Sequence, residues 1–385
     1  MRTIGVVTVA RSDYGIYLPI LRGIQRDPNL RLYLIAGGMH LSTEFGLTVR
    51  QIESDGFRVH ERIEMLLSSD SPEGVAKSVG LGVLGFAQAY ARFQPDILLV
   101  LGDRFEMFAA VAAALPFRIP TAHLHGGEST EGQIDEPIRH SITKMSHLHF
   151  VSNDVYARRL MQMGEAPWRI VVSGAPSLDN LSCFRALSSE ELEERHGFDL
   201  SVAPLLVTYH PVTLEHDQTP YQIGELFAAL DEVGMNVVFT YPNADTSGRS
   251  IVSLIRDYCS SHPRARVAVN LGPDAYFSLM RCAAAMVGNS SSGLIEAPSF
   301  ALPVVNIGNR QRGRLRAGNV IDVGYGRHEI AQAIRRATAP AFRQGIEGLV
   351  NPYGDGQATD RIVTRLKEVA IDEELLLKRF HDIGA

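Results

Sequence analysis

The sequence has few cysteines and no strong excess of charge of either sign. Cys183, Cys259 and Cys282 lie far apart in 385 residues, and no Cys-x-x-Cys pair occurs. This scarcity argues against a disulfide framework and against a thiolate zinc site. The 37 basic and 43 acidic side chains give a net charge of −6. That balance argues against a nucleic-acid partner bound by neutralising many phosphates.

Long hydrophobic runs are also missing. No stretch reaches the ~18 apolar residues of a membrane helix, and the N-terminus reads as a short strand rather than a signal peptide. We therefore expect a cytoplasmic protein with no membrane partner. Hydrophobic residues make up 45% of the chain, which is enough to bury large cores, and the length suggests two domains.

Segments rich in β-branched residues alternate with segments of helical length along most of the chain. This alternation predicts parallel, doubly wound sheets covered by helices on both faces. A polar stretch at 173–199 interrupts it, so we expect an N-terminal domain at 1–175 and a C-terminal domain at 176–364. A final helix at about 365–385 is expected to pack back on the first domain. The predicted fold class is α/β, with two Rossmann-like domains facing a central cleft, where such sheets bind ligands.

A Gly-Asp-Arg segment at 102–104 directly follows an apolar strand that ends at Leu101. A carboxylate at the carboxyl end of a parallel strand stands where α/β enzymes place catalytic groups. Asp103 is therefore a candidate catalytic residue. The alternative is that Asp103 only caps the helix that follows.

The segment 123–128 reads His-Leu-His-Gly-Gly-Glu. Strand alternation predicts His123 and His125 on one face, and the two glycines allow a tight backbone turn before Glu128. Such a set can serve general acid–base catalysis. It could also ligate a metal ion in a metal-dependent hydrolase, or simply close the end of a strand.

A further acidic pair, Asp135 and Glu136, precedes Pro137. Proline suits the first turn of a helix, where the macrodipole favours a charged carboxylate. Asp135 is therefore either a cap or a catalytic group. Arg139 lies one turn later and is placed to pair with Asp135.

The segment 288–293 reads Gly-Asn-Ser-Ser-Ser-Gly, follows a predicted strand and opens a helix expected at 294–301. Free N–H groups and hydroxyls at such a point predict a phosphate site, although a serine-rich cap is the simpler alternative. Glu296 could accept hydrogen bonds from a ribose diol. Arg310, after the next strand, adds positive charge.

The segment 80–85 matches the Gly-x-Gly-x-x-Gly pattern of dinucleotide sites. No strand precedes it, and it lies inside a helical segment. We therefore predict that these glycines allow close helix packing.

In their order and spacing, these motifs resemble those of the hydrolysing UDP-N-acetylglucosamine 2-epimerases, which include bacterial enzymes of the sialic-acid pathway. The resemblance covers nearly the whole chain and includes the stretches 11–15, 210–213, 241–243 and 310–314. It implies a fold like that of the glycosyltransferases with paired Rossmann domains, with UDP held mainly by the second domain. It further implies no cofactor, no resident metal, and a homodimer or homotetramer.

The resemblance also implies roles for individual residues. The catalytic set would be Asp103, His125, Asp135 and Glu128. Ser290 and Ser291 would bind phosphate, Glu296 the ribose, and Tyr276 would lie against uracil. The full set expected to bind the UDP-sugar is Arg11, Asp13, Arg104, His210, Asn243, Leu271, Tyr276, Ser290, Ser291, Ser292, Gly293, Glu296 and Arg310.

The chain departs from the family pattern at several points, and one of them leaves the acid and base roles open. Many members carry Glu at the position of His125, so Glu128 could share the role of His125. One extra residue also lies between Glu128 and Asp135.

The resemblance implies a specific reaction. UDP leaves C1 as the C2 proton is removed, and water then adds to the 2-acetamidoglycal while a proton returns to C2 from the other face. UDP-N-acetylglucosamine would give N-acetylmannosamine for nonulosonic (sialic) acid synthesis. The alternative substrate is UDP-N,N′-diacetylbacillosamine, of legionaminic acid synthesis, because the stretch 66–70 resembles that group more. More distant alternatives are a metal-dependent hydrolase, a glycosyltransferase, a nucleotide-sugar-binding regulator and a non-hydrolysing epimerase.

Overall fold

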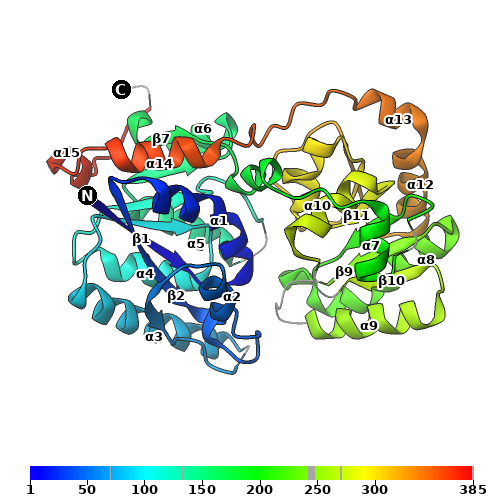
Figure 1. Ribbon diagram of the computed structural model, residues 1–385, viewed down its shortest axis with the longest axis horizontal. Helices are drawn as coiled ribbons and strands as arrows, with labels where there is room; N and C mark the ends of the chain where they lie inside the picture. The colour runs from blue at the N-terminus through cyan, green and yellow to red at the C-terminus, as the bar shows by residue number, and fades with distance from the viewer. Residues whose placement is uncertain (70, 132–133, 199, 242–247, 269–270, 384–385) are drawn as a thin grey trace. The chain divides into compact units, whose positions relative to one another are not determined.

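One parallel sheet organises each of the two units into which the chain divides (Figure 1). The computed structural model describes residues 1–69, 71–131, 134–198, 200–241, 248–268 and 271–383. Unit 1 comprises Met1–Glu128, Ile134–Asp179 and Tyr353–Ala385, and unit 2 comprises Ser129–Gln133 and Asn180–Pro352. The chain thus rejoins unit 1 at Tyr353, earlier than the boundary of 364 that the sequence suggested.

The sheet of unit 1 has the strand order β3-β2-β1-β4-β5-β6-β7. Its strands are β1 (Arg2–Thr8), β2 (Leu30–Gly37), β3 (Val59–Ile63), β4 (Ile97–Leu101), β5 (Thr121–Leu124), β6 (Leu148–Val151) and β7 (Ile170–Val172). Its α-helices are α1 (Arg11–Arg26), α2 (Val49–Ser54), α3 (Pro72–Arg92), α4 (Phe105–Ala114), α5 (Asp135–Met145), α6 (Asp154–Gln162), α14 (Ala358–Glu368) and α15 (Glu373–Leu376). The strand order reverses between β1 and β4, and ligands of such sheets bind at this reversal.

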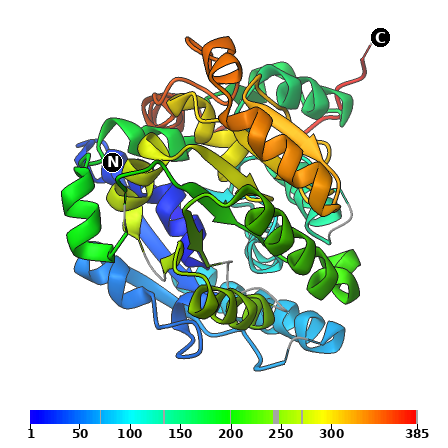
Figure 2. The ribbon, with the colours of Figure 1, turned by 90° about the vertical axis from the view of Figure 1, so that its right-hand side faces the viewer.

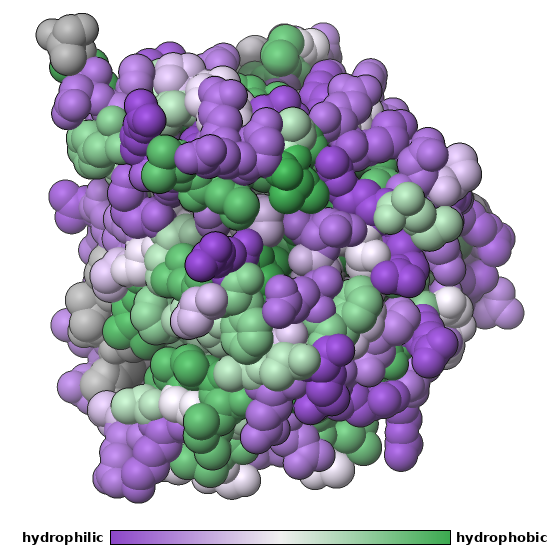
Figure 3. All heavy atoms as spheres, turned by 90° about the vertical axis from the view of Figure 1, so that its left-hand side faces the viewer, coloured by the Kyte–Doolittle hydropathy of each residue, from purple (hydrophilic) through white to green (hydrophobic). Residues whose placement is uncertain are grey.

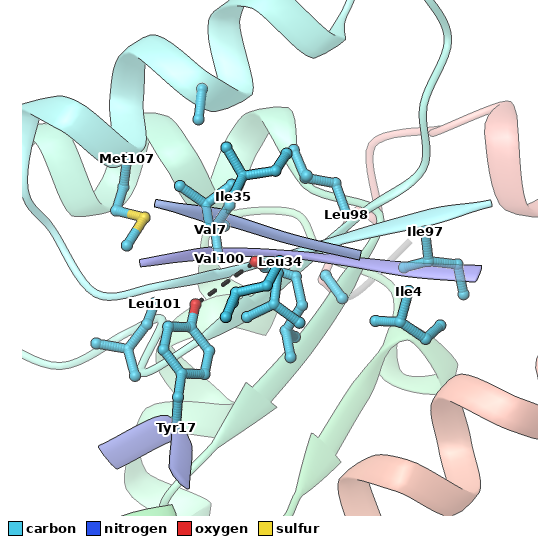
Figure 4. Close-up of a cluster of buried hydrophobic side chains, with 14 of the residues drawn as sticks. Ile4, Val7, Tyr17, Leu34, Ile35, Ile97, Leu98, Val100, Leu101 and Met107 are labelled. Carbon is cyan, nitrogen blue, oxygen red and sulfur yellow. Dashed lines mark hydrogen bonds between the residues drawn. The ribbon is translucent and has the colours of Figure 1, made fainter. Parts of the chain in front are cut away.

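The strands of unit 1 are apolar because helices cover both faces of the sheet. All five residues of β4 are buried, and side chains of β1, β2 and β4 pack together around the centre of the sheet (Figure 4). Tyr17 of α1 reaches into this core, where its hydroxyl donates to the backbone carbonyl of Leu99 at 3.5 Å. Each fully buried Val, Leu or Ile contributes roughly 1.5–3 kcal/mol, so this core provides a rigid base for the sheet edge.

The sheet of unit 2 has the order β10-β9-β8-β11-β12-β13, with the reversal between β8 and β11. Its strands are β8 (Leu205–Thr208), β9 (Val237–Thr240), β10 (Ala265–Ala268), β11 (Ala285–Gly288), β12 (Val304–Ile307) and β13 (Val320–Val323). Its α-helices are α7 (Ser189–His196), α8 (Thr219–Val233), α9 (Gly248–Ser261), α10 (Gly272–Cys282), α11 (Ser292–Ile295), α12 (Arg327–Thr338) and α13 (Pro340–Gly345).

Alternate residues of β8 explain why helices lie on either side of this sheet (Figure 2). Leu205 and Val207 pack into one cluster with α8, α9 and α12. Leu206 packs into a second cluster with α10. The period of two residues in a strand thus divides β8 between two buried layers.

The glycines at 80–85 lie inside α3, as the sequence predicted. A Cβ atom on Gly82 would lie 2.9 Å from the Cβ of Ala109 in α4. The missing side chain therefore lets α3 and α4 pack closely, and the pattern is not a dinucleotide loop.

Some apolar side chains of unit 1 lie on its surface. Leu84 of α3 is 63% exposed and Leu115, at the end of α4, is 45% exposed. Figure 3, which views the left-hand side of Figure 1, shows hydrophobic residues gathered across the middle of this face. Within the described residues, no helix combines the length and apolar character needed to cross a bilayer.

Candidate active site

The loops after β4, β5 and β6 meet at one edge of the sheet of unit 1 because parallel strands end on the same side. Gly102 and Gly127 have φ values of +74° and +75°, and His125 has a φ of +62°. A Cβ atom on Gly127 would lie 2.4 Å from a methyl group of Leu160, so only glycine fits there. A non-glycine residue in this conformation stores strain, which collects at functional sites.

His125 and Glu128 form a closely paired dyad in this turn. The Nδ1 atom of His125 hydrogen-bonds Oε1 of Glu128 at 2.5 Å, and the Ser152 hydroxyl donates to the same oxygen at 3.2 Å. Both side chains of the dyad are nearly buried, at 11% and 3% exposure. The Nε2 atom of His125 is buried without a hydrogen-bond partner among the described residues. An imidazole is suited to proton transfer when a carboxylate orients it and its second nitrogen has no hydrogen-bond partner in the protein.

The left-handed backbone of His125 corrects one expectation. Strand β5 ends at Leu124, so strand alternation does not extend to His125. His123 is fully buried, and its Nε2 and Nδ1 atoms bond Gly102 O at 2.7 Å and Thr143 Oγ1 at 3.2 Å. Burial lowers the pKa of His123 to about 3, so its ring is neutral and supports the turn at Gly102. No group of three His, Cys, Asp or Glu in the described ranges is placed to hold a metal ion.

A buried arginine joins the acidic groups of this edge. Arg139 of α5 forms ion pairs with Asp103 and, at 3.1 Å, with Glu136. It also donates to the backbone carbonyl of Glu128 at 3.0 Å. The sequence offered Arg139 only as a partner for Asp135. Asp103 lies 36 positions earlier, in the loop after β4, and Glu128 lies in the loop after β5. One guanidinium therefore links these two loops.

The two aspartates that the sequence predicts to be catalytic both lie at helix starts. Arg104, not Asp103, is the N-cap residue of α4, so Asp103 is not the cap of that helix. Asp135 is the first residue of α5 and is half-buried, one turn before Arg139.

A second polar cluster lies where β1 and β4 end, at the reversal of the strand order. Asp13 is buried and accepts hydrogen bonds from the backbone N–H groups of Val9 and Ala10 at 3.1 and 3.0 Å. Burial raises the pKa of Asp13 above its usual range, and the nearby charge of Arg104 opposes this effect. Arg104 itself makes two contacts of 3.2 Å with buried Glu106. Asp13 therefore shapes the start of α1, whereas Arg11 in the same turn is exposed.

At the corresponding edge of unit 2, Asn289 organises the backbone. The Asn289 side chain accepts from the His210 N–H at 2.6 Å and donates to the His210 carbonyl at 2.8 Å. Gly288 has a φ of +133°, and a Cβ atom there would lie 1.9 Å from the Thr208 carbonyl oxygen. His210 is buried, and this burial together with the charge of Arg310 holds its pKa well below the usual range.

The serine segment of unit 2 follows Asn289. Helix α11 has only four residues, and a 3₁₀ turn at Ala297–Phe300 follows it, so the helix expected at 294–301 was wrong. Pro298 lacks the N–H that a continuing helix needs. Ser290 Oγ accepts from the Ser292 N–H at 3.3 Å, and Glu296 is buried at the end of α11.

The other residues predicted to bind the nucleotide lie nearby in the chain. Leu271 is the N-cap residue of α10, and Gly293 is buried in α11. The phenol of Tyr276 in α10 bonds the Ser292 side chain, and burial raises the pKa of that phenol. Asn243 falls outside the described residues.

The family model described as UDP-N-acetylglucosamine 2-epimerase matches residues 22–367 of this chain. The chain belongs to this family. A Campylobacter jejuni relative named GDP/UDP-N,N′-diacetylbacillosamine 2-epimerase (hydrolyzing) is 39% identical, with 99% of each chain covered. A Legionella pneumophila relative named UDP-N,N′-diacetylbacillosamine 2-epimerase (hydrolyzing) is 36% identical and covers 98% of this chain and 99% of its own. The chain is accordingly an enzyme of the hydrolysing 2-epimerase type.

A solved structure confirms the fold class. The UDP-GlcNAc 2-epimerase from Neisseria meningitidis, solved bound to UDP-GlcNAc, superposes with a TM-score of 0.82. It is 19% identical and the match covers 95% of this chain and 99% of that one. The glycosyltransferase-B-like α/β class predicted from the sequence is therefore correct.

Proposed function

We propose that this epimerase hydrolyses UDP-N,N′-diacetylbacillosamine, releasing UDP and a free 2-epimerised sugar for nonulosonic acid synthesis. The support for the sugar is that two relatives, both matched over nearly their whole length, carry that substrate in their names. UDP-N-acetylglucosamine is the second candidate, because the description of the family model names it and the Neisseria structure was solved bound to it.

The Nε2 atom of His125, which has no hydrogen-bond partner among the described residues, carries the mechanistic proposal. Asp103, paired with Arg139, stabilises the positive charge that develops at C1 as UDP departs. Asp135 takes the C2 proton on one face. His125, held by Glu128, returns a proton to C2 on the other face while water adds its oxygen to C1 and releases one proton to the solvent.

Unit 2 supplies the nucleotide site in this proposal. Ser290, Ser291, Ser292 and Arg310 hold the diphosphate, and the Tyr276 side of α10 takes the uracil. Neutral His210 is suited to donate a hydrogen bond without adding charge.

Proton NMR in D₂O with each UDP-sugar, and with the GDP form of the diacetylated sugar, tests the proposal. We expect free nucleotide and a free sugar that carries deuterium at C2. The two sugars differ at C4 and C6, and a hydrophobic pocket discriminates by about 10–200-fold in kcat/KM between groups that differ by one methylene. Faster turnover of UDP-N-acetylglucosamine would select the second candidate, and a product that keeps its nucleotide would overturn the hydrolytic step.

A further inference from the structure

A polar network lies behind the loop 308–314 of unit 2, which carries Arg310. Its centre is Glu215, between β8 and α8. The Glu215 carboxylate accepts from the Tyr325 hydroxyl at 2.5 Å, from the Gln222 amide at 2.9 Å and from the Asn309 amide at 3.3 Å. Burial, followed by the bond to Glu215, raises the pKa of Tyr325 to about 12, so its hydroxyl keeps the proton that it donates.

Tyr325 also fixes the first turn of this loop. Its hydroxyl accepts from the Asn309 backbone N–H at 3.3 Å. Gly308 has a φ of +72°, and a Cβ atom there would lie 2.2 Å from the Tyr325 ring. The loop is therefore pressed against an aromatic ring whose position Glu215 determines.

The loop also forms hydrogen bonds with the serine segment at 288–293. Arg310 Nη1 and Gln311 Nε2 both donate to the backbone carbonyl of Asn289, at 3.1 and 2.8 Å. Asn289 immediately precedes Ser290. A continuous set of hydrogen bonds thus runs from Glu215, through Asn309 and the loop, to the segment that we propose binds the diphosphate.

We propose that Glu215 is a positioning residue for the diphosphate site, which acts by holding the loop that carries Arg310. This inference rests on the proposed function. A carboxylate is the group that the network requires, because all three side chains around it donate hydrogen bonds and an ionised carboxylate only accepts. Glutamine in its place would turn an N–H group toward one of those donors and leave it unpaired.

A double-mutant cycle tests the inference, with the Kd of UDP measured by calorimetry. We expect Glu215→Gln to weaken UDP binding about tenfold, and Arg310→Ala to weaken it by at least as much. If Glu215 acts through Arg310, the two effects overlap and the double variant binds UDP about as weakly as Arg310→Ala alone. Glu232→Gln, which weakens surface ion pairs with Arg335 and His328, is the matched control and should leave UDP binding unchanged.

The outcomes separate the inference from the proposed function. If Arg310→Ala leaves UDP binding intact, the proposed diphosphate site is wrong. If Arg310→Ala weakens binding but Glu215→Gln does not, or if the two effects multiply, the positioning role is overturned. Tyr325→Phe, which removes one donor and keeps the ring, repeats the cycle should Glu215→Gln fail to fold.

Discussion

The two sheet edges share one architecture but engage their side chains differently. At the edge of unit 1, ionisable side chains pair with one another: His125 with Glu128, and Arg139 with Asp103 and Glu136. At the edge of unit 2, one backbone carbonyl, that of Asn289, receives the arginine loop. The first arrangement can hold and move protons, whereas the second shapes the backbone around an anion site. The contrast predicts that variants will separate turnover from nucleotide binding.

The largest expected effect is that of Asp103→Asn on turnover. The variant keeps the shape of the side chain but removes the charge that pairs with Arg139, so activity should fall about 10²–10⁴-fold. The Kd of UDP should change little, because unit 2 is untouched. Chromatography of the released UDP measures turnover, and calorimetry measures the Kd of UDP. Equal losses in turnover and in UDP affinity would break the division between the two edges.

Gly288→Ala should instead act on unit 2, by reducing its stability and its binding of UDP. Its methyl group would collide with the Thr208 carbonyl, so we expect a loss of about 3 kcal/mol in the stability of unit 2 and loss of UDP binding. Gly224→Ala in α8 is the matched control, because a Cβ atom there has nothing within 4 Å. Urea unfolding followed by circular dichroism measures the change. A Gly288→Ala variant as stable as the control would contradict the backbone geometry at β11.

Glu128→Gln should lower kcat by about 10–100-fold while the KM and the Kd of UDP stay near their original values. The amide retains the shape of the side chain but removes the carboxylate that orients His125. A residue that acts through a histidine is expected to change activity on this scale. Glu128→Asp, which keeps a carboxylate, separates this role from a merely structural one, because it should restore part of the lost kcat. A Glu128→Asp variant as slow as Glu128→Gln would limit Glu128 to packing the turn.

Local and long-range features of this structure differ in how far the sequence could predict them. The α/β class and the glycine packing of α3 follow from periodicity and from the missing strand before Gly80, both of which are local. The shortened α11 was missed, although Pro298 marked it. The partners of Arg139 and of Glu215 could not be predicted, because Asp103 and Tyr325 lie 36 and 110 positions away and only the sheet topology brings them close.

The smallest expected effect concerns acid stability, and it compares the two units directly. His40, His123 and His149 of unit 1 are fully buried, and burial lowers their pKa to about 4, 3 and 4. In the unfolded chain each titrates near 6.5, so the unfolded state binds more protons below that pH. Stability therefore falls as the pH drops from about 6.5 toward 4, and is unaffected by these groups above 7.

The single tryptophan, Trp168, lies in unit 1 and makes this prediction measurable. In unit 2, His210 is the described histidine that is both buried and strongly shifted, so fewer protons are linked to unfolding of that unit. Between pH 7 and 5, the urea midpoint of the transition followed by Trp168 fluorescence should fall, and the midpoint of the remaining circular-dichroism transition should fall less. Equal shifts of both transitions, or a larger shift in the second, would show that the buried histidines do not distinguish the two units. His123→Asn, which keeps a polar side chain but cannot take up the proton, should reduce the pH dependence of the fluorescence transition and leave the other unchanged.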